Sequence, residues 1–348
     1  MVNYSCDKCG KKFTQKGHYT RHMNKKNPCI HMSKINEMVD AAVEKRLKET
    51  NFTTRLENTI ISPTTNHLTS VREQGLDKFY TIPSYSKKCI HKVNELYDND
   101  SWDLIVEPSA GNGSFYNQIE SSNKIGIDIA PEIDGLVKQD FFTYQPPENN
   151  KRILVIGNPP FGRVSSLAIR FFNHAAQWAD VIAFIIPKTF RRISVQNKLN
   201  DSFHLMYDED VPDKPCSFTP NMSVKCCFQI WERKSEKRPI IKLDTTHPDW
   251  RFLPFGPKDD RGQPTPPKNA DFAIRAYGGN IGEIVTDDLQ NLRPKSWHWV
   301  TANINKNELM NVFTQLDYSN SLNTARQNSM GRGELVLLYT QFRNAIQE

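Results

Sequence analysis

The sequence predicts an α/β fold in which helices cover both faces of a mostly parallel sheet. Short apolar runs, rich in β-branched and aromatic residues, alternate along the middle of the chain with segments of helical periodicity. Strands that are apolar on both faces are typical of parallel sheets, because helices cover them on either side. The chain of 348 residues, 38% hydrophobic and 24% charged, is long enough for one such domain with smaller appendages.

Five strands are expected, and most of them end in a turn that contains glycine or proline. In chain order they are WDLIVEPSAGNG, KIGIDIAP, RILVIGNPPF, DVIAFIIPKTF and VKCCFQIWER. Between the third and the fourth lies SSLAIRFFNHAAQWA, whose apolar residues recur at helical spacing. This alternation predicts parallel strands joined by helices.

The chain divides by composition into four regions. After a short segment rich in Cys and His, residues 33–50 carry apolar side chains at helical spacing, and residues 51–70 are rich in Thr, Asn and Ser. We expect a helix over 33–50, which either packs on the core or pairs with another copy, and a linker over 51–70. The predicted regions are 1–31, 32–70, 71–239, which is the α/β domain, and 240–348.

Residues 240–348 are predicted to form a separate lobe or an extended flank. Residues 240–270 hold many prolines and are expected to be irregular. The stretch DFAIRAYGGNIGEIV predicts a strand, a glycine-rich turn and a second strand, and GELVLLYTQFRNAIQ predicts a helix near the end of the chain.

Charge and cysteine content restrict the class of protein. The net charge of +6 and the pI of about 8.8 are compatible with a polyanionic partner without requiring one. The seven cysteines are an odd number, the N-terminus is polar, and no apolar run is long enough to span a membrane. We therefore expect an intracellular protein, cytoplasmic or nuclear, whose later cysteines are reduced core thiols.

The first region contains a candidate zinc site. Its C-x2-C-x12-H pattern has the spacing of a zinc finger. The four predicted zinc ligands are Cys6, Cys9, His22 and Cys29. His31 and His18 are alternatives for the fourth ligand, because the usual second histidine is missing. A segment of about 30 residues needs such a metal in order to fold, and Phe13 and Tyr19 would form its small core.

The predicted finger is basic. Its cationic side chains are Lys11, Lys12, Lys16, Arg21, Lys25 and Lys26. They suit contact with phosphates, and a single finger that reads about three base pairs would add affinity more than specificity. A finger that binds protein or is purely structural is the alternative.

A glycine loop follows the first predicted strand, in VEPSAGNGSF. Glu107 lies at the end of the strand, and Gly111 and Gly113 follow where small residues let a ligand approach the backbone. The third glycine of the dinucleotide fingerprint G-x-G-x-x-G is missing, which argues against a pyrophosphate ligand. A compact ligand with an amine near Glu107 fits better.

Two carboxylates and an aromatic residue follow the glycine loop in the order expected of a nucleoside site. Asp128 ends the next strand, about 20 residues after the loop, where a carboxylate can accept both hydroxyls of a ribose. Asp140 could accept the amino group of an adenine, and Phe141 could pack on its ring. Each residue alone is better explained as a surface acid or a core aromatic, but the ordered set indicates a nucleoside cofactor.

Five motifs follow one another in the order DKFYTIPSYSKKCIHKV, VEPSAGNGSF, GIDIAP, KQDFF and GNPPF. This order resembles that of the amino-methyltransferases that use S-adenosyl-L-methionine to modify adenine N6. The resemblance covers residues 76–232 and implies a Rossmann-like methyltransferase domain with a seven-stranded sheet. It implies Phe79, Tyr80 and Thr81 at the methionine end of the cofactor, Glu107, Gly111 and Gly113 at its amino acid moiety, Asp128 at the ribose, and Asp140 and Phe141 at the adenine. Pro108 and Ile129 are further predicted cofactor contacts.

The stretch ILVIGNPPFGRV suggests how an amine could be methylated. An aromatic exocyclic amine is a poor nucleophile, because its lone pair is delocalised into the ring. The side-chain oxygen of Asn158 and the backbone carbonyl of Pro159 could accept hydrogen bonds from the two N–H groups of the amine. These bonds would direct the nitrogen lone pair at a methyl group. Pro159 and Pro160 would fix that carbonyl in advance, and Phe161 could stack on a flipped base. A simple turn after a strand is the structural alternative.

The resemblance favours methylation of adenine in DNA. The alternatives are N6 of adenosine in RNA, the side-chain amide of a protein glutamine, and an inactive transferase fold that only binds. Glutamine methyltransferases usually carry tyrosine where this chain has Phe161. A finger joined to a transferase also resembles proteins of large DNA viruses and phages.

Two further stretches are candidates for contact with nucleic acid. Lys188, Arg191 and Arg192 follow the fourth strand, where they could meet phosphates or form a solvated helix start. In the C-terminal region, DFAIRAYGGNIGEI is the candidate for target recognition, since Arg275 could contact a guanine edge or a phosphate. A plain β-hairpin is the alternative there.

Overall fold

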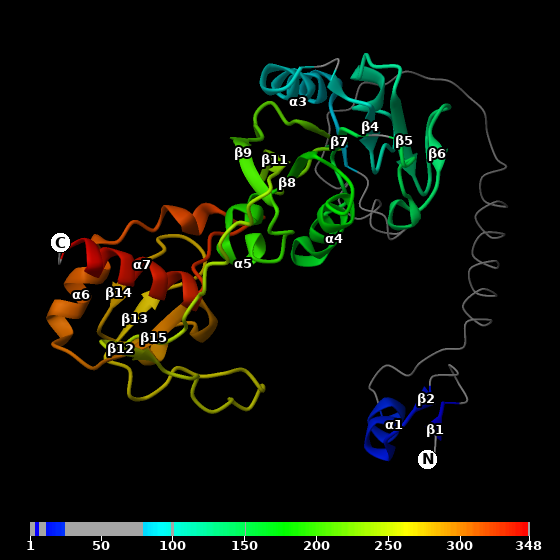
Figure 1. Ribbon diagram of the computed structural model, residues 1–348. Coiled ribbons are helices and arrows are strands. Elements are labelled where there is room, and N and C mark those ends of the chain that lie inside the picture. The colour runs from blue at the N-terminus through cyan, green and yellow to red at the C-terminus, as the bar shows by residue number, and fades with distance from the viewer. Residues whose placement is uncertain (1–3, 7–11, 25–78, 99–100, 150, 347–348) are drawn as a thin grey trace, which may run out of the picture. The chain divides into compact units, whose positions relative to one another are not determined.

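The chain forms two compact units, 1–66 and 67–348. The computed structural model describes residues 4–6, 12–24, 79–98, 101–149 and 151–346 (Figure 1). The helix expected over 33–50 and the linker expected over 51–70 lie outside the described residues.

The larger unit is built on a seven-stranded sheet (Figure 1) with the order β6-β5-β4-β7-β8-β11-β9. The strands are β4 (Leu104–Glu107), β5 (Lys124–Asp128), β6 (Val137–Lys138), β7 (Ile153–Gly157), β8 (Val181–Pro187), β9 (Phe203–Asp210) and β11 (Cys226–Arg233). All neighbours from β6 to β8 are parallel, whereas β11 is antiparallel to both β8 and β9. The prediction of a mostly parallel seven-stranded sheet is confirmed.

The five strands expected from the sequence are β4, β5, β7, β8 and β11, and the two that were missed lie at the edges of the sheet. β6 has only two residues, both exposed, and β9 has the mixed sequence FHLMYDED with one buried residue. An edge strand has less apolar cover than a central strand, so neither shows the apolar run that identified the others.

Neighbouring residues of the central strands face two different apolar layers. Val155 of β7 belongs to the layer that contains residues of helix α4 (Ser166–Ala175). Leu154, one position earlier, belongs to the layer that contains residues of helix α3 (Pro83–Leu96). Because side chains alternate along a strand, the continuous apolar runs cover both faces of the sheet, as the sequence predicted.

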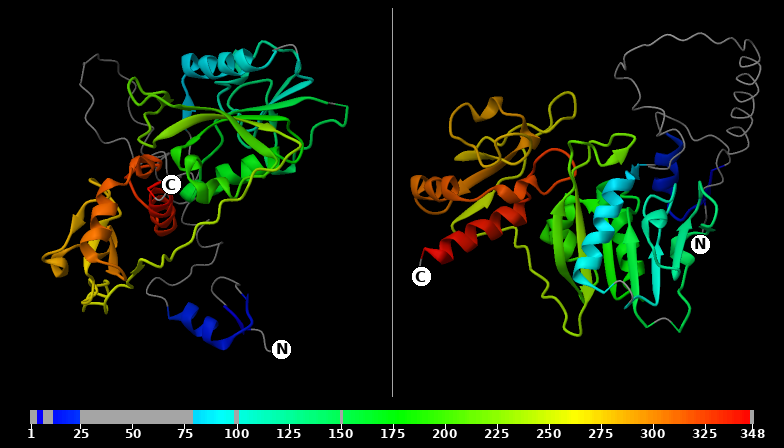
Figure 2. Two further views of the ribbon diagram at one scale, coloured as in Figure 1. Left: turned by 60° about the vertical axis from the view of Figure 1, so that its left-hand side comes forward. Right: turned by 90° about the horizontal axis from the view of Figure 1, so that it is seen from above.

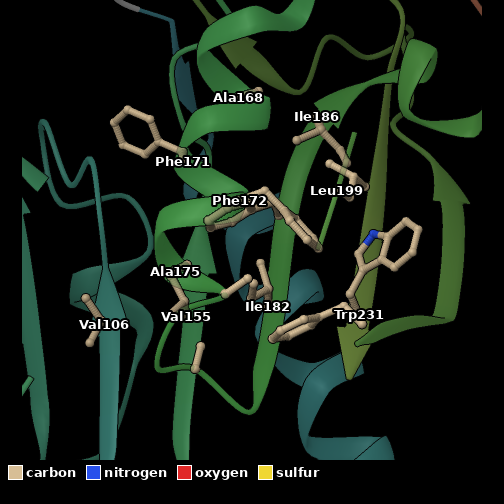
Figure 3. Packing of buried hydrophobic residues seen from close by; sticks show 14 of the residues in the cluster. Val106, Val155, Ala168, Phe171, Phe172, Ala175, Ile182, Ile186, Leu199 and Trp231 are labelled. Carbon is tan, nitrogen blue, oxygen red and sulfur yellow. The ribbon is translucent and has the colours of Figure 1, made fainter. Parts of the chain in front are cut away.

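Helix α4 packs on the sheet through one face. Ala168, Phe172 and Ala175 are all fully buried and recur at helical spacing. In Figure 3 their side chains lie over strand residues that include Ile182. Phe172 also meets Trp231 edge to face, with the ring centroids 5.6 Å apart. A fully buried Phe side chain contributes about 1.5–3 kcal/mol, so this face holds α4, and the loop before it, firmly on the sheet.

Short elements complete this part of the unit. β3 (Tyr80–Thr81) pairs antiparallel with β10 (Phe218–Thr219), and Pro83 begins α3 at the first helical position, where its missing N–H costs nothing. The other elements are α5 (Ile193–Gln196) and the 3-10 helices η3 (Tyr116–Gln118), η4 (Phe141–Thr143), η5 (Arg163–Ser165) and η6 (Lys188–Arg191).

Residues after 240 form an antiparallel sheet with two helices (Figure 2). Its order is β12-β15-β13-β14, and a core that includes Trp250, Phe313 and Tyr339 joins the sheet to the helices. The elements are β12 (Trp250–Phe252), β13 (Phe272–Arg275), β14 (Ile284–Val285), β15 (Trp297–Ala302), α6 (Lys306–Gln315), α7 (Arg332–Ala345), and the 3-10 helices η7 (Leu289–Asn291), η8 (Pro294–Ser296) and η9 (Ser319–Leu322). The predicted hairpin (β13 and β14) and C-terminal helix (α7) are confirmed.

Contacts within the larger unit join the two sheets. Arg192, after η6, forms an ion pair with Glu334 of α7 and donates to the hydroxyl of Ser329 at 3.2 Å. Lys225 donates to the side-chain oxygen of Asn328 at 2.7 Å. Arg192 is therefore part of the structure that supports the C-terminal residues.

The smaller unit contains a short hairpin and one helix in its described part. β1 (Tyr4–Ser5) pairs antiparallel with β2 (Lys12–Phe13), and α1 (Lys16–Met23) follows. In neither unit do the described residues include a helix that is both long enough and apolar enough to cross a membrane.

Candidate active site

Three polar side chains lie at the carboxyl ends of adjacent parallel strands. Glu107 ends β4, Asp128 ends β5, and Asn158 follows the last residue of β7. Because β4 pairs with β5 on one side and with β7 on the other, these ends meet at the same edge of the sheet. Ligands of open α/β sheets bind at this edge, so the residues predicted from the sequence converge on one place.

Glu107 is a buried carboxyl group with an elevated pKa. It is 2% exposed, and its Oε2 accepts the backbone N–H of Tyr116 at 2.7 Å. Burial raises the pKa of Glu107 to about 8, because the charged form loses hydration. A cation that arrives beside Glu107 would favour the charged form, so this carboxyl suits an ammonium ligand.

Gly157 brings the end of β7 close to Glu107. A Cβ atom at residue 157 would lie 3.2 Å from Cγ of Glu107 and 3.5 Å from Cδ of Pro108. The absence of a side chain there lets the backbone that leads into Asn158 run directly past the buried carboxyl. The motifs VEPSAGNGSF and GNPPF therefore lie in direct contact, and Pro108, a predicted cofactor contact, is part of that contact.

Asp128 fixes the glycine loop. Its two carboxylate oxygens accept the N–H groups of Gly111 at 2.8 Å and of Ala130 at 2.7 Å. Gly111 has a φ of +51°, in the left-handed region where glycine is favoured, and a Cβ there would meet the Tyr80 ring at 2.7 Å. Gly113 continues the turn by donating to the carbonyl of Ala110 at 2.6 Å. Each oxygen of Asp128 retains a further lone pair for a hydroxyl donor.

The strand β3 brings the predicted FYT segment onto this loop. The ring of Tyr80 lies against Gly111, and its hydroxyl donates to Glu132 at 2.5 Å. Burial and this bond to a carboxylate raise the pKa of Tyr80. Thr81 is 2% exposed, and its hydroxyl oxygen has no hydrogen-bond partner among the described residues. A buried polar atom of this kind calls for a ligand atom or water.

The side chain of Asn158 is held in one orientation. Its Nδ2 donates to the backbone carbonyl of Phe79 at 3.0 Å, and the backbone carbonyl of Asn158 accepts the hydroxyl of Ser109 at 3.1 Å. A carbonyl can only accept, so the NH2 group must face Phe79 and the Oδ1 atom must point elsewhere. No described residue donates to Oδ1, which leaves it as an oriented acceptor.

The residues after Asn158 are anchored to α4. Pro159 is buried, whereas Pro160 and Phe161 are half-buried, and Phe161 packs against both apolar layers of the sheet. The carbonyl of Phe161 accepts the N–H groups of Leu167 and Ala168 at the start of the helix. The chain from 158 to 161 is therefore a fixed bridge between β7 and α4.

The structure does not support the expected packing of Phe141 on a bound ring. Phe141 is 2% exposed, and its ring centroid lies 5.2 Å from that of Phe171 and 4.9 Å from that of His174. It is a core residue. Asp140 is exposed and accepts the N–H of Phe142 at 3.0 Å. The apolar side chain that lies open beside Asp128 is Ile129, which is 52% exposed.

The cationic residues proposed for phosphate contact are engaged in ion pairs. Lys188 lies 2.6 Å from Asp210, and Arg191 lies 2.6 Å from both Asp208 and Asp210. These carboxylates belong to β9, the strand that the sequence did not reveal. Within this cluster the described charges neutralise one another, which does not favour the phosphate contact considered from the sequence.

Arg275, the candidate for base recognition, is also engaged. It lies 2.7 Å from Glu283, and its guanidinium stacks over the ring of Trp297 at 4.3 Å. These contacts stabilise the β13–β14 hairpin and agree with the structural alternative.

The described part of the finger contains two of the four predicted zinc ligands. Cys6 is 1% exposed, and the ring of His22 lies 4.9 Å from that of Phe13. Phe13 and Tyr19 pack edge to face at 6.0 Å, as expected of a small core. Cys9, Cys29 and the alternative His31 lie outside the described residues. Zinc binding therefore stays a prediction.

Several supporting residues were not identified from the sequence. Ser109, Tyr116 and Glu132 hold Asn158, Glu107 and Tyr80, respectively. Ser109 and Tyr116 lie close in sequence to the glycines of the loop, which could have directed attention to them. Glu132 lies outside the quoted motifs, so no sequence signal indicated its contact with Tyr80.

One family model matches the start of the chain. The family model "Zinc finger, C2H2 type" matches residues 4–25, a range that ends before Cys29. No curated protein matches the chain.

Solved structures are similar to this chain in fold. The 23S rRNA methyltransferase ErmE is 16% identical, with a TM-score of 0.35 over 47% of this chain and 72% of that chain. A provisionally assigned RNA methyltransferase from Pyrococcus horikoshii is 15% identical, with a TM-score of 0.35 over 46% of this chain and 89% of its own. The magnesium protoporphyrin IX methyltransferase of Synechocystis PCC 6803, with bound SAM, is 10% identical, with a TM-score of 0.31 over 43% and 80%.

At these identities the likeness concerns the fold alone, and the assignment rests on the strand order of the sheet. The larger unit has a Rossmann-like, mostly parallel seven-stranded sheet, as predicted.

Proposed function

We propose that the chain transfers a methyl group from S-adenosyl-L-methionine to the N6 amine of adenine in DNA. The observation that carries the proposal is the orientation of the Asn158 side chain, whose NH2 group donates to Phe79 and whose Oδ1 accepts no hydrogen bond from the described residues. A neutral, preoriented acceptor at the carboxyl end of a sheet strand suits an incoming N–H donor.

The residues around β4 and β5 fit S-adenosyl-L-methionine. The buried Glu107 would hold the ammonium group, Asp128 would accept the ribose hydroxyls, and the exposed Ile129 would cover the adenine. The unpartnered hydroxyl of Thr81 would bond to the amino acid end. When bound, this cofactor supplies a methyl group on a positively charged sulfur.

Asn158 and Pro159 would activate the acceptor amine. Asn158 Oδ1 accepts one N–H bond and the carbonyl of Pro159 accepts the other, so the nitrogen lone pair is localised and directed at the methyl group. The nitrogen would form a new N–C bond to the methyl group that the cofactor supplies, the electron pair of the broken C–S bond would stay on sulfur, and the methylated nitrogen would then lose a proton to water. No strong base is needed, because the nitrogen becomes acidic only after methylation.

A nucleic-acid substrate agrees with the other features of the chain. The net charge is +6, and a C2H2-type finger precedes the transferase domain. The aromatic Phe161 lies next to the acceptors and is only half-buried, so it can offer a face to a base that has left the helix.

The substrate class is tested with purified protein and S-adenosyl-L-methionine labelled in the methyl group. Separate pools of unmodified DNA, RNA and protein are incubated, and labelled nucleosides or amino acids are identified by mass spectrometry. N6-methyldeoxyadenosine from the DNA pool is the expected product. N6-methyladenosine from RNA alone would transfer the same chemistry to RNA, and labelled glutamine alone would overturn the nucleic-acid assignment.

A further inference from the structure

Val164 is an apolar side chain that the fold holds in solvent beside the catalytic segment. It is 81% exposed, more than any other large hydrophobic residue that the structure describes. It follows Phe161 by three positions and belongs to η5, directly before α4. An isolated exposed hydrophobe needs no explanation in itself, but the backbone around Val164 is unusual.

The backbone at this point is in an unfavourable conformation. Val164 has a φ of +53° and Ser165 a φ of +60°, and a Cβ at Gly162, whose φ is +67°, would lie 2.7 Å from the Cβ of Leu167. Left-handed φ values are rare for β-branched residues such as valine, because the branched Cβ meets the backbone. Such conformations persist where the surroundings determine them, and they cluster at functional sites.

Contacts on both sides determine this conformation. Before Val164, the carbonyl of Phe161 accepts two N–H groups of α4. After it, Ser165 is 3% exposed, and its hydroxyl lies 2.7 Å from that of Thr189. The loop is therefore tied down at both ends, and the side chain between them is directed outward.

We propose that Val164 is the wedge that enters duplex DNA when the target adenine leaves the stack, an inference that rests on the proposed function. A base inside a duplex cannot reach the acceptors at Asn158 and Pro159, so it must be flipped out. Proteins that open or kink DNA insert apolar side chains between base steps. Val164 is apolar, preoriented and close in sequence to those acceptors.

Arg163 supports this assignment. Its side chain is exposed, and within the described residues it forms no ion pair, in contrast to Arg191 and Arg192. A guanidinium beside the wedge can bind a phosphate of the opened strand, which positions the duplex without reading its sequence.

The test compares one DNA sequence in two forms. Unmodified circular phage DNA is supplied as a single strand and as the duplex, and initial rates of methylation are measured for the wild type and for Val164→Gly. The ratio of the duplex rate to the single-strand rate is expected to fall about tenfold in the variant, because the wedge assists only where a base must be extruded. Thermal stability should stay equal or rise, since glycine accepts a positive φ.

Leu96→Ala is the matched control. Leu96 is 46% exposed and is the last residue of α3. It precedes the start of β4 in the chain, whereas Asn158 follows the end of β7. Its rate ratio is expected to equal that of the wild type. Arg163→Gln should weaken duplex binding and make that binding less dependent on salt.

Each result decides the proposal. An unchanged ratio in Val164→Gly, or a loss of activity that accompanies a lower melting temperature, overturns the wedge and leaves the proposed function standing. A wild type that methylates only the single-stranded form also overturns the wedge. A wild type that labels neither form contradicts the proposed methylation of DNA, and the wedge falls with it.

Discussion

Two polar clusters follow neighbouring strands of the sheet and differ in how fully their hydrogen bonds and charges are satisfied. After β8, Lys188 and Arg191 are paired with carboxylates of β9. After β7, the side-chain oxygen Oδ1 of Asn158 accepts no hydrogen bond within the described residues, and the nearby Thr81 hydroxyl is buried without a partner among them. In the first cluster the charges are paired within the folded chain, whereas the second retains hydrogen-bonding groups that a ligand can use.

The two clusters separate the polar residues of this chain that serve the fold from those that are available to a ligand. Both clusters looked functional in the sequence, since both place charged or amide groups directly after an apolar strand. A saturated cluster contributes to stability and offers little to a ligand. A cluster with oriented, unused acceptors costs free energy unless a ligand or water completes it.

Loss of the Asn158 acceptor should have the largest effect. Asn158→Ala is expected to lower the rate of methyl transfer by about 10²–10³-fold, the range found when one preorganised hydrogen-bonding group is removed from an active site. Cofactor affinity should fall much less than the rate, because Oδ1 faces the acceptor amine and only the bond from Nδ2 to Phe79 touches the predicted cofactor segment. Single-turnover rates and equilibrium binding of the cofactor check the two quantities separately.

Asn311→Ala, at an exposed position on α6, is the matched control and should keep the wild-type rate. A parallel loss of cofactor affinity in Asn158→Ala would show that the residue supports the cofactor site rather than the acceptor.

Glu107 should produce the next largest effect, and a characteristic dependence on pH. Its pKa is raised to about 8 by burial, so the free protein carries a neutral carboxyl at lower pH. An ammonium ligand binds the charged form, and cofactor affinity should therefore rise as the pH increases toward about 8. Glu107→Gln should bind about tenfold more weakly near pH 8 and lose this rise. Calorimetric titrations from pH 6 to 8 measure both.

The free energy of unfolding gives an independent check. A raised pKa means that the folded state binds this proton more tightly than the unfolded state. The stability that Glu107 contributes is thus present at low pH and is lost as the pH rises from about 4.3 to about 8. Denaturation of the cofactor-free protein should show this decline relative to Glu107→Gln. Parallel curves for the two proteins would contradict the buried, neutral state.

Arg191 should affect stability without affecting the chemistry. Arg191→Met leaves Asp208 and Asp210 without their shared partner, and we expect the free energy of unfolding to fall by about 1–3 kcal/mol. The DNA affinity and the methylation rate should stay within about twofold of the wild type. Urea denaturation and filter binding measure these changes.

The control for Arg191 is Lys237→Met, which removes an exposed ion pair with Asp201 and should cost about 0–1 kcal/mol. If Arg191→Met instead loses DNA binding while its stability is retained, the cluster after β8 contacts phosphate and the comparison between the two clusters fails.

The sequence predicted the parts of the fold whose residues are close together and apolar. The central strands β4, β7 and β8 are buried on both faces, and this produces continuous apolar runs that a sequence displays directly. The edge strand β9 is only partly covered, so its mixed sequence resembles a loop. Its carboxylates, and with them the pairing of Lys188 and Arg191, could not be foreseen.

The candidate site follows the same rule. Glu107, Asp128 and Asn158 were found because each ends or follows an apolar strand, and parallel strands bring such ends together. The bond from Asn158 to Phe79 spans 79 residues and depends on where β3 is placed, which no local pattern reveals. Phe141 was misjudged because an aromatic residue after a strand suits the core as well as a ligand, and the contact with Phe171 places it in the core.

The finger should have the smallest effect on chemistry, because its predicted role is to add affinity. Cys6 is almost completely buried in a unit that has few other buried side chains among its described residues. Cys6→Ser should reduce the zinc content from one equivalent to none, as measured by plasma mass spectrometry, because a structural site needs all four ligands. The rate at saturating DNA should stay within about twofold, while the DNA affinity falls modestly.

Cys216→Ser, a half-buried thiol in the larger unit, is the control that should retain zinc. If the Cys6→Ser protein still holds one zinc, the metal is not bound by the predicted finger. A protein that loses zinc and also loses its rate at saturating DNA would show that the finger acts in the chemical step. The finger would then belong with Asn158, among the groups that complete the site, and the division between a catalytic unit and an affinity unit would no longer hold.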